Sequence, residues 1–334
     1  MQKIIGHKKE KETLFAILSS GMIPHAFLFS GNAGIGKRML AHSFLRALFC
    51  EAEKKPCGVC PSCRQVEALT HPDVVMIAPN ENGTLPIGDP DTPEPGSVRY
   101  LIQRMSMRSV SGRTGVIIDG IERATNEAQN ALLKTLEEPP SGSCIILISS
   151  DRSGILPTIQ SRVREIRFAP LSSDDLRLIV GDRAEGDILD FVVSGAGGSA
   201  STALELCNAD MREKVLSLCR SLSAAMTGGG SLAGLTNTIL PKPKGGIDIL
   251  DILIQIYRVL LASKAKDDGQ YSSLLDDIYI DDIDTLRTII KLLFATKKGR
   301  GNNINTALQL RALAYYALHS KEPFAPPFAA AHSD

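Results

Sequence analysis

The run Gly31 to Lys37 has residue types and spacing that could bind phosphate. It reads Gly-Asn-Ala-Gly-Ile-Gly-Lys, follows an apolar segment at 26–30, and precedes apolar residues at helical spacing. In such a strand–loop–helix context, glycines at Gly31, Gly34 and Gly36 let backbone N–H groups cradle phosphate oxygens. The Lys37 ammonium would reach the terminal phosphates. A glycine-rich turn with a chance lysine is the weaker alternative, so the run predicts a site for ATP or ADP.

Two positions near this loop lack the groups that ATP hydrolysis needs. A phosphate loop normally has Ser or Thr after the lysine to hold Mg²⁺, but this chain has Arg38, which cannot coordinate a cation. Asp119 ends an apolar segment and is the expected Mg²⁺ carboxylate, yet the water-polarising Glu expected next is Gly120. We expect Glu122 to point elsewhere. The pattern argues against ordered Mg²⁺ and hydrolysis, and leaves open whether Arg38 blocks nucleotide or adds a phosphate contact.

Four closely spaced cysteines could hold a metal ion. Cys50, Cys57, Cys60 and Cys63 follow the spacing C-x6-C-x2-C-x2-C, with Pro and Gly residues turning the chain between them. Four thiolates make a closed tetrahedral zinc site with no open position, which predicts structural zinc. An iron–sulfur cluster and disulfides are alternatives, but the usual cluster motifs are not evident and a reducing compartment disfavours disulfides. The remaining cysteines are expected to pack in apolar surroundings, namely Cys144, Cys207 and Cys219.

The elements that would position these residues alternate between strand and helix. The expected strands are short apolar segments, at 26–30, 74–77, 115–119 and 144–148. A helix is expected at 126–138, ended by two prolines, and 79–96 is expected to be an exposed loop. This alternation predicts an α/β domain with a parallel sheet covered on both faces. After about residue 170 the strand signal fades and helical spacing dominates, with flexible interruptions at 228–230 and 241–246.

Composition narrows the classes of function. The 334 residues include 37 basic and 37 acidic side chains, so the formal net charge is zero. A protein that binds DNA through its own charge is usually basic, so we expect any DNA contact to be local or shared with partners. No secretory signal and no apolar run of membrane-spanning length is visible, which predicts a cytoplasmic protein without membrane contact.

One long run carries a family resemblance. The segment 130–140 reads Asn-Ala-Leu-Leu-Lys-Thr-Leu-Glu-Glu-Pro-Pro. Together with cysteines placed after a phosphate-loop helix, it closely resembles bacterial clamp-loader subunits of the AAA+ superfamily, in particular the delta-prime and gamma/tau subunits of DNA polymerase III. The resemblance covers most of 1–205 and returns at 303–310, which is similar to a signature of the delta-prime collar helices.

The resemblance implies a domain organisation. It implies an AAA+ ATPase-like domain at 1–170, with its zinc module at 50–63. A small helical lid would follow at 171–208, and a helical collar at 209–322 would serve oligomerisation. The Ala/Pro-rich tail at 323–334 is expected to be disordered.

The resemblance also implies roles for single residues. Ser150 lies at the first sensor position. Arg162 lies in a Ser-Arg-Val run where the family has Ser-Arg-Cys, and there the arginine reaches the ATP of a neighbouring subunit as a finger. An ordinary surface salt bridge, for example to Glu165, is the alternative for Arg162. At the second sensor position, where active members have arginine, this chain has Ser201.

The function that the resemblance implies is assembly. The chain would be a delta-prime subunit of the DNA polymerase III holoenzyme, without ATPase activity of its own. It would form a pentamer with gamma/tau and delta subunits that loads a sliding clamp on primed DNA. The first alternative is an active gamma/tau-type ATPase, which the missing catalytic groups disfavour. A small kinase and a zinc-dependent DNA-binding module are further alternatives, disfavoured by the cysteines and by the neutral charge respectively.

Overall fold

The computed structural model describes residues 4–228, 248–266, 272–278 and 280–299, together with residues 309, 310, 312, 314 and 315. The chain divides into two units, Met1–Leu171 and Ser172–Asp334. Each unit is described by itself below. Within the described ranges, no helix is both long and apolar enough to cross a membrane.

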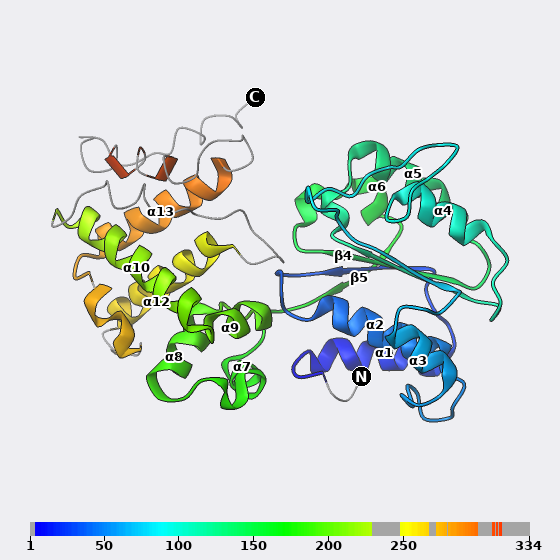
Figure 1. Ribbon diagram of the computed structural model, residues 1–334, viewed down its shortest axis with the longest axis horizontal. Coiled ribbons are helices and arrows are strands. Elements are labelled where there is room, and N and C mark those ends of the chain that lie inside the picture. The colour runs from blue at the N-terminus through cyan, green and yellow to red at the C-terminus, as the bar shows by residue number, and fades with distance from the viewer. Residues whose placement is uncertain are drawn as a thin grey trace. The chain divides into compact units, whose positions relative to one another are not determined.

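The first unit is built on a five-stranded parallel sheet (Figure 1). The strands lie in the order β2-β3-β4-β1-β5, so that β1, which leads into the phosphate loop, lies inside the sheet between β4 and β5. Their bounds are β1 Ala26–Ser30, β2 Val74–Ile77, β3 Thr114–Asp119, β4 Ser143–Ser149 and β5 Arg164–Arg167. Because all five run in one direction, their carboxyl ends share one edge of the sheet, which is where ligands bind in open α/β folds.

Helices cover both faces of the sheet (Figure 1). They are α1 Lys8–Ser20, α2 Lys37–Phe49, α3 Pro61–Glu67, α4 Val98–Ser106, α5 Asn126–Glu137 and α6 Pro157–Gln160, with 3-10 turns η1 Ile121–Arg123 and η2 Arg152–Gly154. Alternate residues of β1 serve opposite cores: Phe27 and Phe29 pack with α1 and α2, whereas Ala26 and Leu28 pack with α4, α5 and α6. The inner strands β1, β3 and β4 are therefore buried on both faces, as is typical of parallel strands between two helical layers.

The second unit is helical. Its described elements are α7 Ser173–Val180, η3 Gly181–Arg183, α8 Gly186–Gly195, α9 Ala200–Leu206, α10 Ala209–Met226, α12 Ile249–Lys266, η4 Ser273–Ile278 and α13 Ile283–Gly299. Tyr257 is fully buried, and its hydroxyl donates to the carbonyl of Cys219 at 2.9 Å and lies 2.8 Å from the Ser223 hydroxyl. This pairing satisfies a buried phenol that would otherwise destabilise the packing of α10 against α12.

The predicted α/β fold class, with a parallel sheet and a helical C-terminal part, is confirmed. Several elements of the first unit were not predicted, namely α1, α3, α4, α6 and β5. The loop at 79–96 is not wholly exposed, because Leu85 is fully buried in the core. The three-domain division stays a prediction. The signature at 303–308, the tail at 323–334 and the interruptions at 229–230 and 241–246 lie outside the described residues.

Candidate nucleotide site and metal centre

The strand order assembles the predicted nucleotide site from three separate segments. β4 lies between β1 and β3, so its carboxyl end separates the phosphate loop from Asp119. In the register of the sheet, Ser30 pairs with Ser149 and Asp119 pairs with Ile148. The loop after β1, Ser150 after β4 and Asp119 at the end of β3 therefore share one edge. The fold thus brings together residues that are far apart in the sequence.

The backbone conformation of the phosphate loop requires glycine at two positions, Gly31 and Gly36. Gly31 has a φ of 145°, and a Cβ there would lie 2.4 Å from the carbonyl oxygen of Phe168. Gly36 has a φ of 101° and caps the start of α2. Both backbones lie in the left-handed region that favours glycine. His7, which the sequence did not single out, supports the loop from outside, because its Nε2 lies 2.6 Å from the carbonyl oxygen of Ile35.

Lys37 points into the loop. Its side chain is buried, and its Nζ donates to the carbonyl oxygens of Gly31 at 2.6 Å and Asn32 at 2.5 Å. Burial lowers the pKa of Lys37 to about 8, while the charges of Glu122 and Asp119 act in the opposite direction. The Lys37 ammonium makes its direct hydrogen bonds to two neutral carbonyls, so an anionic phosphate would stabilise its charged form further.

Arg38 lies at the position where a magnesium ligand is expected. Its Nη1 is 3.5 Å from Oδ2 of Asp119. Burial raises the pKa of Asp119, and the charges of Arg38 and Lys37 oppose that rise. Mg²⁺ requires oxygen ligands at ~2.0–2.1 Å in octahedral geometry. A guanidinium has no lone pair to give, and it already neutralises the carboxylate that the ion would use. These residues therefore do not fit a Mg²⁺ ion.

Gly120 and Glu122 show why the usual catalytic glutamate is absent. Gly120 has a φ of 74°, and a Cβ there would lie 3.1 Å from Pro79, so the backbone itself disfavours a side chain at this position. The expectation that Glu122 points elsewhere is only partly right. Its Oε1 accepts from the N–H of Ser150 at 3.1 Å and from the Ser150 hydroxyl at 2.6 Å. Glu122 nonetheless lies near enough to shift the pKa of Lys37 and Asp119.

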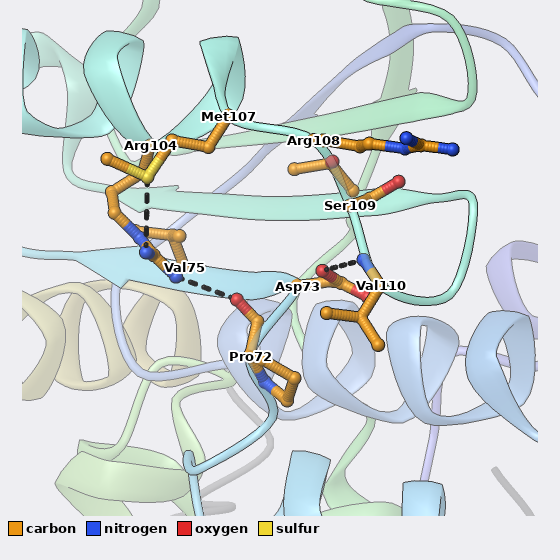
Figure 2. Close-up of a pocket in the computed structure, with 9 residues that line it drawn as sticks. Pro72, Asp73, Val75, Arg104, Met107, Arg108, Ser109 and Val110 are labelled. Atoms are coloured by element: carbon orange, nitrogen blue, oxygen red, sulfur yellow. Dashed lines mark hydrogen bonds between the residues drawn. The ribbon is translucent and has the colours of Figure 1, made fainter.

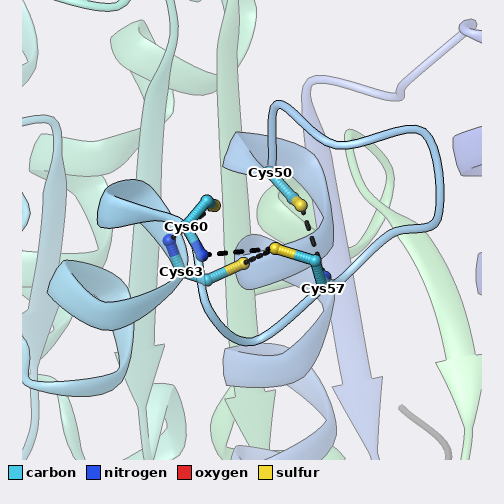
Figure 3. Close-up of side chains that lie close together, drawn as sticks. All are labelled: Cys50, Cys57, Cys60 and Cys63. Atoms are coloured by element: carbon cyan, nitrogen blue, oxygen red, sulfur yellow. Dashed lines mark hydrogen bonds between the residues drawn. The ribbon is translucent and has the colours of Figure 1, made fainter.

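The four predicted cysteine ligands come together at the far end of α2 (Figure 3). Their Sγ atoms all lie within 4.8 Å of one another. Zinc–sulfur bonds of ~2.3 Å in a tetrahedron place the sulfurs ~3.8 Å apart, so a small contraction would suffice. The backbone N–H groups of Cys57, Cys60 and Cys63 donate to the sulfurs of Cys50, Cys57 and Cys60, respectively. Such donors favour thiolates, and the cluster could hold a metal ion such as zinc.

The thiols of the cluster differ in their environments. Hydrogen bonds from the backbone N–H groups of Val59 and Cys60 lower the pKa of Cys57 to about 6. Burial instead raises the pKa of Cys63 to about 12. A buried thiol of this kind releases its proton when a cation binds, so metal binding and deprotonation are coupled.

Arg162 lies just after α6 and contacts its own chain. Its guanidinium pairs with Glu137 at 2.7 Å, and it donates to the carbonyl oxygen of Thr158 at 2.8 Å and the hydroxyl of Ser161 at 3.2 Å. The alternative of an ordinary surface salt bridge fits the pairing with Glu137. Only its example partner, Glu165, is wrong, because Glu165 pairs with Arg152 and Arg167 instead. The Arg162 side chain is 35% exposed.

A small cavity of about 140 Å³ lies at the opposite edge of the sheet, where β2 and β3 begin (Figure 2). Asp73 is buried there, and its oxygens accept from the N–H groups of Val110 at 2.9 Å and Ser111 at 2.7 Å. Arg104 donates to the carbonyl oxygen of Pro72 at 2.8 Å. These hydrogen bonds satisfy Asp73 and Arg104 within the protein and anchor the segment between α4 and β3. We therefore assign these residues a structural role.

The first unit is a P-loop domain, with its phosphate loop between β1 and α2 and an acidic residue at the end of β3. Residues 6–172, half of the chain, match the family described as DNA polymerase III, delta subunit. The chain belongs to this family, in its delta-prime branch.

Individual relatives include both delta-prime and gamma/tau subunits. The chain is 35% identical over 197 residues to DNA polymerase III subunit delta-prime of Pseudomonas aeruginosa, covering 57% of this chain and 58% of that one. It is 32% identical over 217 residues to subunit gamma/tau of Mycobacterium bovis, covering 61% of this chain and 36% of the relative. The match thus spans about a third to three fifths of these relatives. A gamma subunit-related structure from Thermotoga maritima is 21% identical with a TM-score of 0.47, covering 93% of this chain and 99% of that one.

Proposed function

We propose that the chain is a clamp-loader subunit that does not hydrolyse ATP and instead contributes Arg162 to the ATP site of a neighbouring gamma/tau subunit. The proposal rests on the residues of the chain's own nucleotide site. Arg38 occupies the metal-ligand position beside Asp119, and the position after Asp119 is a glycine with a positive φ. A site of this kind lacks both a magnesium ligand and a water-polarising base.

The nucleotide-binding role is assigned to Gly31, Gly34, Gly36, Lys37 and Asp119. The loop, the buried ammonium and the start of α2 together form an anion-binding cradle. Ser150, at the first sensor position, donates a hydrogen bond to Glu122. This contact would couple Ser150 to changes at the nucleotide site.

A structural zinc ion is assigned to Cys50, Cys57, Cys60 and Cys63. With all four positions filled by protein, it would stabilise the turn between α2 and α3 and take no part in chemistry.

Breaking the contact that Arg162 makes with Glu137 in its own chain should require little free energy. The Arg162–Glu137 pair is partly exposed, with side-chain exposures of 35% and 49%. Such pairs contribute ~0–1 kcal/mol, so a phosphate on a neighbouring subunit can compete for the guanidinium. An arginine finger is worth about 10³–10⁵ in rate when it reaches the transferred phosphate.

The rest of the proposal concerns assembly. Residues 171–208 would form the lid, and 209–322 the collar that holds a pentamer with gamma/tau and delta subunits in the cytoplasm. The complex would open a sliding clamp and place it on primed DNA. The zero net charge is in keeping with DNA contact through the complex as a whole.

ATP turnover tests this proposal directly. The chain alone should show none. Gamma/tau and delta subunits should gain DNA-stimulated turnover when the wild-type chain is added, and should lose at least about tenfold with Arg162→Ala. The matched control is Arg164→Ala, because Arg164 is an exposed arginine two residues away. Full stimulation by Arg162→Ala would overturn the finger, and brisk turnover by the isolated chain would favour the alternative of an active gamma/tau-type ATPase.

A further inference from the structure

Arg38 is the residue of the nucleotide site that the usual phosphate-loop pattern does not explain. It is the second residue of α2, next to Lys37, and its guanidinium lies 3.5 Å from Asp119. A divalent cation held by Asp119 would occupy this same space. The chain therefore supplies its own cation where other phosphate loops recruit a metal ion.

The charges around the loop are balanced without a metal. Lys37 and Arg38 carry two positive charges, and Asp119 and Glu122 carry two negative ones. A polyphosphate entering this site meets two side-chain cations on one helical turn. A guanidinium binds phosphate oxygens through two parallel N–H donors, and it keeps its charge at every physiological pH. It can replace the neutralising role of Mg²⁺, but not the ordering of a water molecule for attack.

Arg38 is also free to move onto a phosphate. Its side chain is 64% exposed, and its pairing with Asp119 is long at 3.5 Å. An exposed pair of this length contributes little to stability, so its exchange for a phosphate contact is inexpensive. Arg38 lies in the first turn of α2, and the start of a helix favours an anion.

We propose that this loop binds a nucleoside diphosphate or triphosphate without a divalent metal ion, with Arg38 in the place of Mg²⁺ and Asp119 holding the guanidinium until the phosphates arrive. The inference rests on the nucleotide site proposed above and not on Arg162. Nucleotide bound in this way is not activated for hydrolysis, because neither a metal ion nor a base positions a water molecule for attack.

Binding of methylanthraniloyl-ADP to the full chain, followed by fluorescence anisotropy, tests the inference. Titrations are run with excess MgCl₂ and in buffer stripped of divalent cations, with zinc content measured in both. The wild-type Kd should differ by less than about threefold between the two conditions. Arg38→Thr installs the usual metal-binding hydroxyl, so its affinity should fall at least about tenfold without Mg²⁺ and recover when Mg²⁺ is added. The control is Arg108→Thr, an exposed arginine at the far edge of the sheet, which should behave as wild type.

Three results would overturn the inference: wild-type binding that requires Mg²⁺, no binding in either condition, or undiminished metal-free binding by Arg38→Thr. Thermal unfolding checks that each variant is folded, and the exposure of Arg38 makes a folding defect unexpected. The turnover test of Arg162 is made on the complex, so its outcome is separate. If the chain binds no nucleotide at all, the proposed nucleotide site is wrong as well, but the proposed role of Arg162 is unaffected.

Discussion

The phosphate loop and the cysteine cluster lie at opposite ends of one helix, α2, and they differ in how their groups are gathered. Gly36 caps the start of α2, and Cys50 caps its end. All four cysteines lie within 50–63, whereas the nucleotide site also needs Asp119 from β3 and Ser150 from the end of β4. One site is therefore local in sequence and the other is made by the sheet.

The two sites also differ in completeness. The cluster has four thiols and three N–H donors to sulfur, so it has every group that a closed zinc site needs. The nucleotide site keeps its cradle, but has an arginine and a glycine where catalysis needs a metal ligand and a base. The comparison indicates that one end of α2 has all four ligands of a closed metal site, whereas the other end lacks a magnesium ligand and a base.

The largest expected effect is at the cluster. Cys63→Ala removes a buried ligand, and bound zinc should fall from about one per chain to none. Because metal binding and folding of such modules are coupled, the free energy of unfolding should fall by more than about 4 kcal/mol. Metal analysis and thermal unfolding measure the two effects.

Cys207→Ala is the control for this change, because Cys207 lies outside the cluster in the second unit. It should leave the zinc content unchanged. A Cys63→Ala variant that keeps its zinc and its melting temperature would show that the cluster is not the metal site.

The next effect is at the loop itself. Gly31→Ala would place a Cβ 2.4 Å from the Phe168 carbonyl oxygen at a φ of 145°. Strain and overlap together should lower the free energy of unfolding by about 2–4 kcal/mol, measured as a lower urea midpoint. Nucleotide binding should also be lost, because the loop must shift.

Gly21→Ala separates the two causes. Gly21 has a φ of 71° but open space around it, so alanine there should cost only about 1 kcal/mol. If both variants lose the same free energy of unfolding, the close approach of Phe168 to the loop does not contribute to the effect of Gly31→Ala.

The contrast between the two sites also explains what the sequence could predict. The cluster was found from spacing alone, because its ligands are neighbours in the chain. Strands β1 to β4 were found because they are apolar, and β1 and β2 have the expected bounds. The edge strand β5 was missed because three of its four residues are charged and only Ile166 is buried. A charged edge strand has the composition of a loop.

Contacts between distant segments were not predictable. The pairing of Arg162 with Glu137, the support of the loop by His7 and the contact of Glu122 with Ser150 all depend on which elements pack together. Arg38 was visible in the sequence as a departure from the motif. Its proximity to Asp119 required the strand order, which brings the ends of β1 and β3 to the two sides of β4.

A smaller effect is expected from pH. Burial lowers the pKa of Lys37 to about 8, with Asp119 and Glu122 opposing and Arg38 always charged. A bound phosphate stabilises the protonated amine and raises that pKa, so binding takes up a proton above pH 8. Affinity for ADP should therefore be constant below about pH 7.5 and fall by up to about tenfold per pH unit above about pH 8.5.

Lys37→Arg is the matched variant, because a guanidinium keeps its proton across this range. Its affinity, whatever its level, should not depend on pH. A flat profile for the wild-type chain would mean that Lys37 does not face the phosphates, and the loop would then resemble the cluster in being structural only.

The smallest expected effect is communication between the two ends of α2. The loop is supported by β1, His7 and Phe168, none of which contributes a ligand to the cluster. The helix between them is anchored on its buried face by Phe44 and Leu45. Removal of zinc with a chelator should therefore change the Kd for methylanthraniloyl-ADP by less than about threefold, at a temperature where the chain remains folded. Loss of nucleotide binding together with zinc would show instead that α2 transmits the state of one end to the other, and the metal would then control whether the chain can carry nucleotide.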